Sequence, residues 1–266
     1  MTKFSYILLP PLRTFPSEAE IRDGFSYLRA AGYEGVEINL TEPAGVRLTD
    51  LKDWITNCGL TIPSFLTGEA YHDGLCLSSP DETSRQGAVD RLCDYIRVAE
   101  QFGSILVVGL LQGLRTDEPD EQVANDRIAH CLAQVASVAE RHGVDIVLEP
   151  VNHLQVGFNH TVTEVCAMID RVGSTAIKPM VDTIHMNIEE RSMVEPIFQS
   201  AANLRHVHLC ESNGGIFGTG NIDFAPILNA LEQIDYAHFA STKIYRAPMR
   251  DAARSALEFL QNEGRN

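Results

Sequence analysis

Hydrophobic residues in this chain fall into short runs that alternate with longer stretches of helical period. Between the runs lie segments such as Asp81–Phe102 and Glu118–His142, where apolar residues recur at intervals of three and four. The short runs predict strands over Phe4–Leu9, Gly35–Leu40, Thr61–Thr67, Ser104–Gly109, Val144–Leu148, Ile177–Val181, Arg205–Leu209 and Ala237–Ile244. The pattern therefore predicts repeated strand–helix units from one end of the chain to the other.

Glycines and small polar residues mark the expected ends of the helices. The segments Ser17–Glu20 and Thr161–Glu164 resemble capping boxes, which begin helices. A glycine, which favours the left-handed backbone of a helix C-terminus, precedes several predicted strands: Gly32, Gly59, Gly103, Gly143 and Gly173.

Eight strand–helix units in 266 residues predict a closed (β/α)8 barrel, or TIM barrel, as a single α/β domain over residues 1–266. Apolar runs such as Ser104–Val108 suit a parallel sheet that is buried on both faces. The alternative is an open doubly wound sheet, whose first strand is normally followed by a glycine-rich turn. Here Pro10-Pro11-Leu12-Arg13 follows the first strand, so the barrel is favoured.

Composition narrows the classes of partner. The chain is 44% hydrophobic and 21% charged, which is ordinary for a globular protein. Its formal net charge of -15 argues against binding to nucleic acid or to an anionic membrane, since both need a basic surface. No run approaches the ~20 apolar residues of a membrane span, and the N-terminal apolar run is too short for a signal peptide. With six cysteines and no C-x-x-C pair, we expect a cytoplasmic protein with free thiols.

Ionisable residues follow several predicted strands, at the end of a barrel where active sites lie. The fifth strand is followed by Glu149, the sixth by Asp182 and His185, and the seventh ends near His208. Carboxylate oxygens and an imidazole nitrogen together suit a divalent metal. For each residue alone, a structural ion pair is the alternative, because a buried charge must be paired. The set of Glu149, Asp182 and His208 predicts a metal site and therefore an enzyme.

Other polar residues are expected around the same opening. Glu211 is predicted to contact the substrate or to brace His208, whereas His206 is predicted to be a packed, hydrogen-bonded histidine. The glycine-rich loop Asn213–Gly220 could bind phosphate through backbone N–H groups, or could simply make tight turns. The predicted substrate contacts are Glu37, His153, Gln155 and Glu211, with ordinary loop polarity as the alternative for the middle two.

Several segments carry a resemblance to a known family. They are Leu148–Asn152, Val181–Glu190, His206–Asn213 and Gly218–Phe224. Together they resemble the xylose isomerase-like barrel family, and more closely its branch of ketose 3-epimerases and hydroxypyruvate isomerases. The likeness covers essentially the whole chain.

The resemblance implies a divalent ion held by Glu149, Asp182, His208 and a second glutamate. Mn²⁺ is the first choice, with Mg²⁺, Co²⁺ or Zn²⁺ as alternatives. It also implies that His185 contacts a carbohydrate substrate, and that a proton leaves the carbon beside a ketone to form an enediolate. A homodimer or tetramer is left open.

The chain departs from the family pattern at three places. Lys243 stands where the resemblance puts the second glutamate ligand, Gln155 replaces a glutamate, and Gly214 replaces an arginine. A protonated lysine cannot ligate a metal and would repel it, whereas a neutral lysine could act as a base. Three alternatives follow: a metal on three protein ligands with Lys243 as acid/base or anion anchor, Lys243 in place of the metal, and a site that only binds.

The sequence thus predicts a metal-dependent isomerase or epimerase of a ketose or ketose phosphate, with Glu149, His185 and Lys243 as catalytic residues. One alternative is a lyase, either a decarboxylase or a dehydratase, acting on a keto sugar acid at the same site. Another is a non-catalytic sugar-binding protein. Nuclease activity, found elsewhere on this fold, is disfavoured by the negative charge and by the lack of ligands for further metals.

Overall fold

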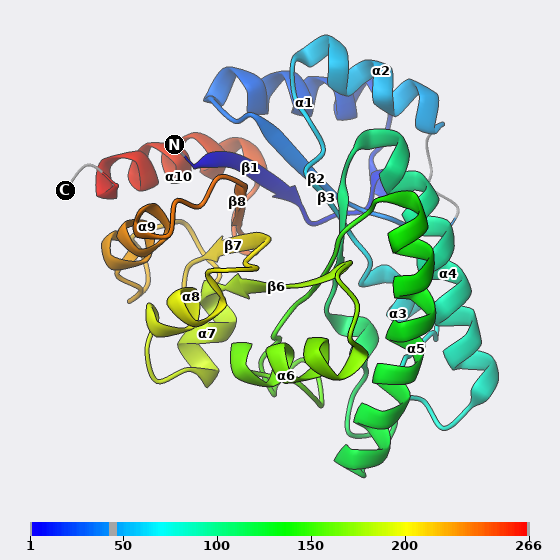
Figure 1. The fold of residues 1–266 in the computed structure, drawn as a ribbon. Coiled ribbons are helices and arrows are strands. Elements are labelled where there is room, and N and C mark those ends of the chain that lie inside the picture. The colour runs from blue at the N-terminus through cyan, green and yellow to red at the C-terminus, as the bar shows by residue number, and fades with distance from the viewer. Residues whose placement is uncertain (1, 43–46, 265–266) are drawn as a thin grey trace.

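The computed structural model describes residues 2–42 and 47–264, and its parallel strands close into one barrel in chain order (Figure 1). Pairing of the first strand with the last closes the cylinder. Every predicted strand overlaps an observed one, and the predicted TIM barrel is confirmed. The strands are β1 (Lys3–Leu8), β2 (Gly35–Asn39), β3 (Ser64–Leu66), β4 (Ile105–Val108), β5 (Ile146–Leu148), β6 (Ile177–Asp182), β7 (His206–Cys210) and β8 (Phe239–Lys243).

Helices surround the barrel (Figure 1). Short 3-10 helices η1 (Leu12–Thr14) and η2 (Leu110–Gln112) follow β1 and β4. The α-helices are α1 (Glu18–Ala31), α2 (Leu48–Cys58), α3 (Glu69–His72), α4 (Glu82–Phe102), α5 (Glu121–His142), α6 (Val162–Val172), α7 (Thr183–Glu189), α8 (Glu195–Ser200), α9 (Phe224–Gln233) and α10 (Met249–Glu263). No helix in the described ranges is long and apolar enough to cross a membrane.

Capping hydrogen bonds and glycines mark the ends of the helices at the positions that the sequence predicts. Thr161 and Glu164 form both hydrogen bonds of a capping box at the start of α6. At Ser17 the hydroxyl accepts the N–H of Glu20, one of the two bonds of such a box. The predicted C-terminal glycines of α1, α2, α4, α5 and α6 all adopt positive φ: Gly32, Gly59, Gly103, Gly143 and Gly173.

The strands alternate between two environments, because successive side chains point to opposite faces. Outward-facing residues such as Val207 and Leu209 of β7 join the large core between barrel and helices. Inside the barrel, Ile105, Val107, Val147 and Met180 form a separate apolar cluster with Leu66 packed against it. His206 and His208, which alternate with the two outward residues, face the barrel interior.

Candidate active site

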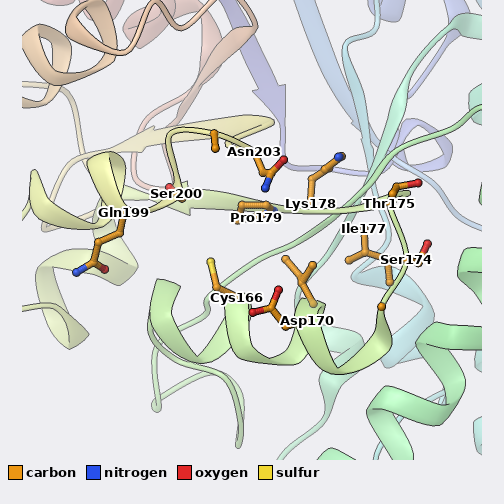
Figure 2. A pocket seen from close by; sticks show the side chains of 13 residues that line it. Cys166, Asp170, Ser174, Thr175, Ile177, Lys178, Pro179, Gln199, Ser200 and Asn203 are labelled. Carbon is orange, nitrogen blue, oxygen red and sulfur yellow. The ribbon is translucent and has the colours of Figure 1, made fainter.

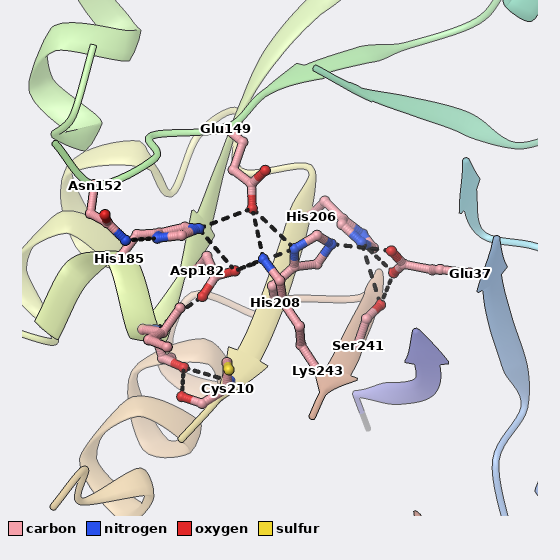
Figure 3. Close-up of polar contacts among 12 residues, drawn as sticks. Glu37, Glu149, Asn152, Asp182, His185, His206, His208, Cys210, Ser241 and Lys243 are labelled. Atoms are coloured by element: carbon pink, nitrogen blue, oxygen red, sulfur yellow. Dashed lines mark hydrogen bonds and ion pairs between the residues drawn. The ribbon is translucent and has the colours of Figure 1, made fainter. Parts of the chain in front are cut away.

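The expected cluster lies at the C-terminal ends of β5 to β8 (Figure 3). Glu149 directly follows β5, Asp182 ends β6, His208 lies in β7 and Lys243 ends β8. The β6–β7 register places Asp182 beside His208, and the β7–β8 register brings Lys243 beside Cys210. One donor atom each from Glu149, Asp182 and His208 lie within 4.8 Å of one another, and all three residues are buried. The predicted convergence of these three residues is therefore observed.

Two carboxylate oxygens form the centre of the cluster. The Lys243 ammonium donates to Asp182 Oδ2 at 2.8 Å and to Glu149 Oε1 at 3.4 Å. The same two oxygens lie 3.5 and 3.3 Å from His208 Nδ1, and each lies 3.7 Å from His185 Nε2. Three nitrogen-bearing side chains thus meet two acidic ones at a single point.

The charges in this cluster depend on one another. Burial alone would raise the pKa of Glu149, but the positive charge of Lys243 and a contact with His208 lower it to about 2. Burial likewise opposes ionisation of Asp182, yet Lys243 holds its pKa well below the usual range. The two carboxylates in turn keep the pKa of Lys243 well above its ordinary value, although burial acts in the other direction. Near neutral pH Glu149 and Asp182 are therefore carboxylates, and Lys243 is an ammonium group.

His185 faces this cluster in its neutral form. It lies in α7, and burial, the largest influence, lowers the pKa of its imidazole. The Asn152 amide lies 2.7 Å from His185 Nδ1, while the Asn152 carbonyl oxygen accepts the N–H of Leu154. Because the oxygen is fixed as the acceptor, the amide NH₂ donates to Nδ1, and the ring proton resides on Nε2. His185 thus presents an N–H donor to the point where Glu149 and Asp182 meet.

Asn152 was not among the predicted site residues. Its signal in the sequence was its position just after Glu149, in the segment Leu148–Asn152. Its contact with His185 depends on the three-dimensional fold and could not be predicted from the sequence.

Glu37 lies deeper in the barrel than predicted. It occupies the middle of β2 and is fully buried. Its carboxylate lies 2.6 Å from His206 Nε2 and 3.1 Å from His208 Nε2, and it accepts a hydrogen bond from Ser241 (Figure 3). Glu37 thus holds His208 from below, and its contact with the substrate stays a prediction.

The two histidines of β7 differ in charge. Burial lowers the pKa of His206 despite the nearby Glu37, so this imidazole is the packed, hydrogen-bonded histidine that was predicted. Burial also disfavours the charged form of His208, but Glu37, Asp182 and Glu149 together raise its pKa well above the usual value. His208 Nδ1 makes no hydrogen bond within the described ranges and is directed at the carboxylates of the cluster.

Glu211 binds backbone N–H groups of the loop that follows β7. One of its oxygens accepts the N–H groups of Ser212 and Ile222 at 2.8 and 3.2 Å, and the other accepts the N–H of Gly218 at 3.1 Å. A Cβ at Gly220 would lie 2.3 Å from the carboxylate, so a glycine is required there. Glu211 therefore organises the loop after β7, and its carboxylate occupies the Gly218 N–H of the glycine-rich segment Asn213–Gly220. That Glu211 contacts the substrate or braces His208 stays a prediction.

The other two predicted substrate contacts lie on the exposed loop after β5. The backbone N–H of His153 donates to the carboxylate of Glu189 in α7 at 2.8 Å, and the ring Nδ1 of His153 lies 2.5 Å from the same oxygen. Gln155 is exposed, and its backbone N–H bonds to the carbonyl of Asn152. The fold does not bring either side chain into the buried cluster.

A separate groove of about 410 Å³ lies outside the barrel, between α6 and α8 (Figure 2). Its lining includes Cys166, Asp170 and Gln199 from the helices, and Lys178 from the beginning of β6. Because the groove adjoins the start of β6 rather than its end, it is distinct from the cluster around Glu149.

Comparison with known proteins places this geometry among sugar-converting barrels. A family model described as xylose isomerase-like TIM barrel matches residues 25–263. An L-ribulose 3-epimerase of Mesorhizobium japonicum is 31% identical over 238 residues, which cover 88% of this chain and 79% of that protein. A ketose 3-epimerase of Arthrobacter globiformis is 29% identical over 219 residues, covering 81% and 74% of the two chains. A solved structure of an L-ribulose 3-epimerase superposes with a TM-score of 0.87 at 27% identity, over 100% of this chain and 96% of the other.

Proposed function

Because this chain belongs to the xylose isomerase-like TIM barrel family, we propose that it is a sugar isomerase or epimerase that acts on a ketose through an enediolate. Relatives that match most of the chain are named as epimerases of L-ribulose or of ketoses in general. A ketose carries the acidified C–H bond beside its carbonyl that this chemistry requires.

The observation that carries the proposal is the meeting of opposite charges at the barrel opening. A carboxylate that removes a proton must lie beside groups that stabilise the negative charge left on the substrate oxygens. Glu149, which is 7% exposed, supplies the carboxylate. The Lys243 ammonium and the Nε2–H of His185 supply positive charge and a hydrogen-bond donor within 3.7 Å of it.

In the proposed reaction, Glu149 takes the proton from the carbon next to the ketone. The electrons of that C–H bond form the carbon–carbon double bond of the enediolate, while the carbonyl electrons move onto the oxygen. Delivery of a proton from solvent to the opposite face of the same carbon, with loss of the Glu149 proton to solvent, gives the epimer. Return of the Glu149 proton to the neighbouring carbon, with transfer of the hydroxyl proton to the other oxygen, gives the isomer. His185 is proposed to donate to the substrate oxygen as negative charge grows there.

The residues of the cluster suit the divalent metal implied by the family only in part. Glu149, Asp182 and His208 have suitable donor atoms, and the unpartnered Nδ1 of His208 is directed correctly. A metal at its usual ~2.0–2.2 Å from these carboxylate oxygens would, however, share them with the Lys243 ammonium, which bonds to the same two atoms. The residues present do not fit a divalent ion together with Lys243 in this position. The Mn²⁺ dependence that the resemblance implies therefore enters no step of the proposed reaction.

An unphosphorylated ketose is favoured over a ketose phosphate. In the glycine-rich loop Asn213–Gly220, the N–H groups of Gly214 and Gly218 bind Glu211, that of Gly215 binds the Asn213 side chain, and that of Thr219 binds the carbonyl of Ile216. A phosphate there would meet negative charge instead of free donors. Cytoplasmic location and assembly into a dimer or tetramer stay predictions from the sequence.

Hydrogen exchange tests the proposal directly. The protein is incubated in D₂O with a panel of free ketoses, including L-ribulose, and deuterium at the carbon beside the carbonyl is followed by NMR. We expect incorporation with at least one ketose, accompanied by its epimer or isomer. The Glu149→Gln variant should exchange ~10²–10⁴-fold more slowly, the usual contribution of a general base.

Two parallel measurements, CO₂ release from a keto sugar acid and ketose binding, separate the alternatives. Release of CO₂ from a keto sugar acid, without exchange into any ketose, would replace the proposal with the lyase. Ketose binding without exchange, whether or not Mn²⁺ is added, would replace it with a sugar-binding function.

A further inference from the structure

We propose that the Lys243 ammonium takes the place of the divalent ion in this site, so that the protein's chemistry needs no bound metal. The inference rests on the proposed function for its meaning, but its test measures metal binding and is independent of turnover. It assigns to Lys243 the role of the resident cation.

The position of Lys243 is fixed by the barrel. It is the last residue of β8, next to β7 in the sheet, and its side chain reaches toward the ends of β5 and β6 (Figure 3). There its nitrogen bonds to Asp182 Oδ2 at 2.8 Å and to Glu149 Oε1 at 3.4 Å. These two oxygens belong to the same donor group of Glu149, Asp182 and His208 that could hold an ion.

Burial of Lys243 disfavours a second cation at the same two carboxylates. Lys243 is only 7% exposed, so its charged nitrogen is largely shielded from water. The ring of Tyr245 lies 5.6 Å from the nitrogen and adds a favourable contact with the cation. A divalent ion bound to Glu149 and Asp182 would be held against this ammonium, with little solvent between them to weaken the repulsion.

The charges of the cluster are also satisfied without a metal. Two buried carboxylates require positive partners. Lys243 gives both of them one shared cation, and His208 lies between this pair and the third buried carboxylate, Glu37. An ion with two further positive charges would have to bind to acidic groups that already have partners.

An ammonium can also do the electrostatic part of the work of a metal. It carries positive charge and N–H donors to the oxygens on which an enediolate accumulates its negative charge. Unlike a metal, it has no open coordination positions, so the substrate is oriented by hydrogen bonds, including the one available from His185 Nε2.

Measurement of metal retention tests the proposal. The native chain is equilibrated with Mn²⁺, desalted and analysed for metal, and Mn²⁺ affinity is measured by calorimetry. We expect no stoichiometric Mn²⁺ in the native chain. The Lys243→Glu variant should retain about one Mn²⁺ per chain, because a cation is replaced by a fourth ligand. Its affinity should exceed that of the native chain by at least about 100-fold, since a ligand is gained and a like charge is lost.

A matched control separates the site from a general change in charge. Lys178→Glu makes the same substitution at the beginning of β6, at the end of the strand remote from Asp182. It should leave Mn²⁺ binding as weak as in the native chain. Equal gains in both variants would contradict the proposal, because the effect would then belong to net charge.

Three outcomes would overturn the inference. One is a native chain that holds about one Mn²⁺ at Glu149, Asp182 and His208 with Lys243 in place. Another is a folded Lys243→Glu variant, checked by circular dichroism, that gains no affinity. The third is loss of ketose exchange by the native chain after EDTA treatment, with recovery on Mn²⁺ addition. If Lys243→Glu does not fold, the native measurements still decide the question, and a failure of ketose exchange under all conditions would reject the proposed function alone.

Discussion

The interior of the barrel has two halves that are filled in different ways. Toward β3–β6 it contains the apolar cluster of Ile105, Val107, Val147 and Met180. Toward β1, β2, β7 and β8 it contains buried polar groups: Ser5, Glu37, His206, His208 and Ser241. Both halves are closed to solvent, yet one is held by packing and the other by hydrogen bonds and charge.

The difference shows which half orients the active site. Apolar contacts have no direction and tolerate changes of shape at constant volume. Hydrogen bonds do have direction, and a buried polar group without its partner is costly. Glu37 accepts from Ser241 and fixes Nε2 of His208, which directs Nδ1 toward Glu149 and Asp182. The polar half therefore sets the geometry of the opening, while the apolar half supplies volume and stability.

The largest effect is expected when the centre of the polar half is removed. Glu37→Ala leaves His206 and His208 without their carboxylate, and breaking a buried ionic network at one partner costs about 3–5 kcal/mol. Urea unfolding of the native and variant chains would measure this loss. A cost below about 1 kcal/mol, the size of an exposed ion pair, would show that the polar half is not the ordering element.

Acid stability sharpens the same comparison. His206 and His208 hold the pKa of Glu37 well below its ordinary value of 4.5, against the opposing effect of burial. Glu37 therefore stabilises the fold fully above pH 4.5, and this stabilisation is lost as the pH falls through the lower folded pKa. The conservative variant Glu37→Gln removes one titrating carboxylate from that window.

The slope of stability against pH checks this prediction. Between pH 4.5 and the folded pKa, the native chain should lose stability more steeply than Glu37→Gln. The difference should approach about 1.4 kcal/mol per pH unit, the value for one proton. Parallel slopes in the two chains would mean that Glu37 titrates in the folded state as it does in the unfolded chain.

The outline of the barrel was predictable because its signals are local. Apolar runs set the strands, and glycines such as Gly103 and Gly143 set the helix ends. The meeting of Glu149, Asp182 and His208 followed from the rule that parallel strands end on one side of a barrel. Each of these inferences needs only a short segment of sequence and the fold class.

Depth and partner choice were not predictable in this way. Alternation along β2 turns Glu37 inward, but its depth depends on the stagger that pairs it with Ile7 of β1. The carboxylate of Glu211 accepts hydrogen bonds from the N–H groups of Gly218 and Ile222. The position of Glu211 after a strand does not predict these partners. The contact of Lys243 with Asp182 spans 61 positions in the chain and forms only when β6, β7 and β8 pair in register. Such features depend on three-dimensional registers that local patterns leave open.

A smaller effect is expected from Asn152, which connects the polar interior to the substrate side. Asn152→Ala would leave the buried Nδ1 of His185 without its donor, at a cost of about 1–3 kcal/mol. Asn152→Asp goes further, because an acceptor at this position draws the ring proton from Nε2 to Nδ1. We expect both variants to exchange ketose protons more slowly, and Asn152→Asp to be the slower of the two. Equal rates, with the imidazole tautomer followed by ¹⁵N NMR, would contradict the assigned role of Asn152.

The smallest effect is expected in the apolar half. Met180 is fully buried among Ile105, Val107 and Val147, and its replacement by leucine conserves volume and character. Such exchanges usually cost less than about 1.5 kcal/mol, because nearby side chains can repack without losing a directional bond. Met180 precedes Asp182 by two positions on the same inward face of β6, so the substitution lies directly beneath the charged cluster. Urea unfolding and ketose exchange of Met180→Leu should therefore both stay close to native. A loss of exchange as large as that of Asn152→Asp would mean that packing in the apolar half orients Asp182, and the division of labour between the two halves would fail.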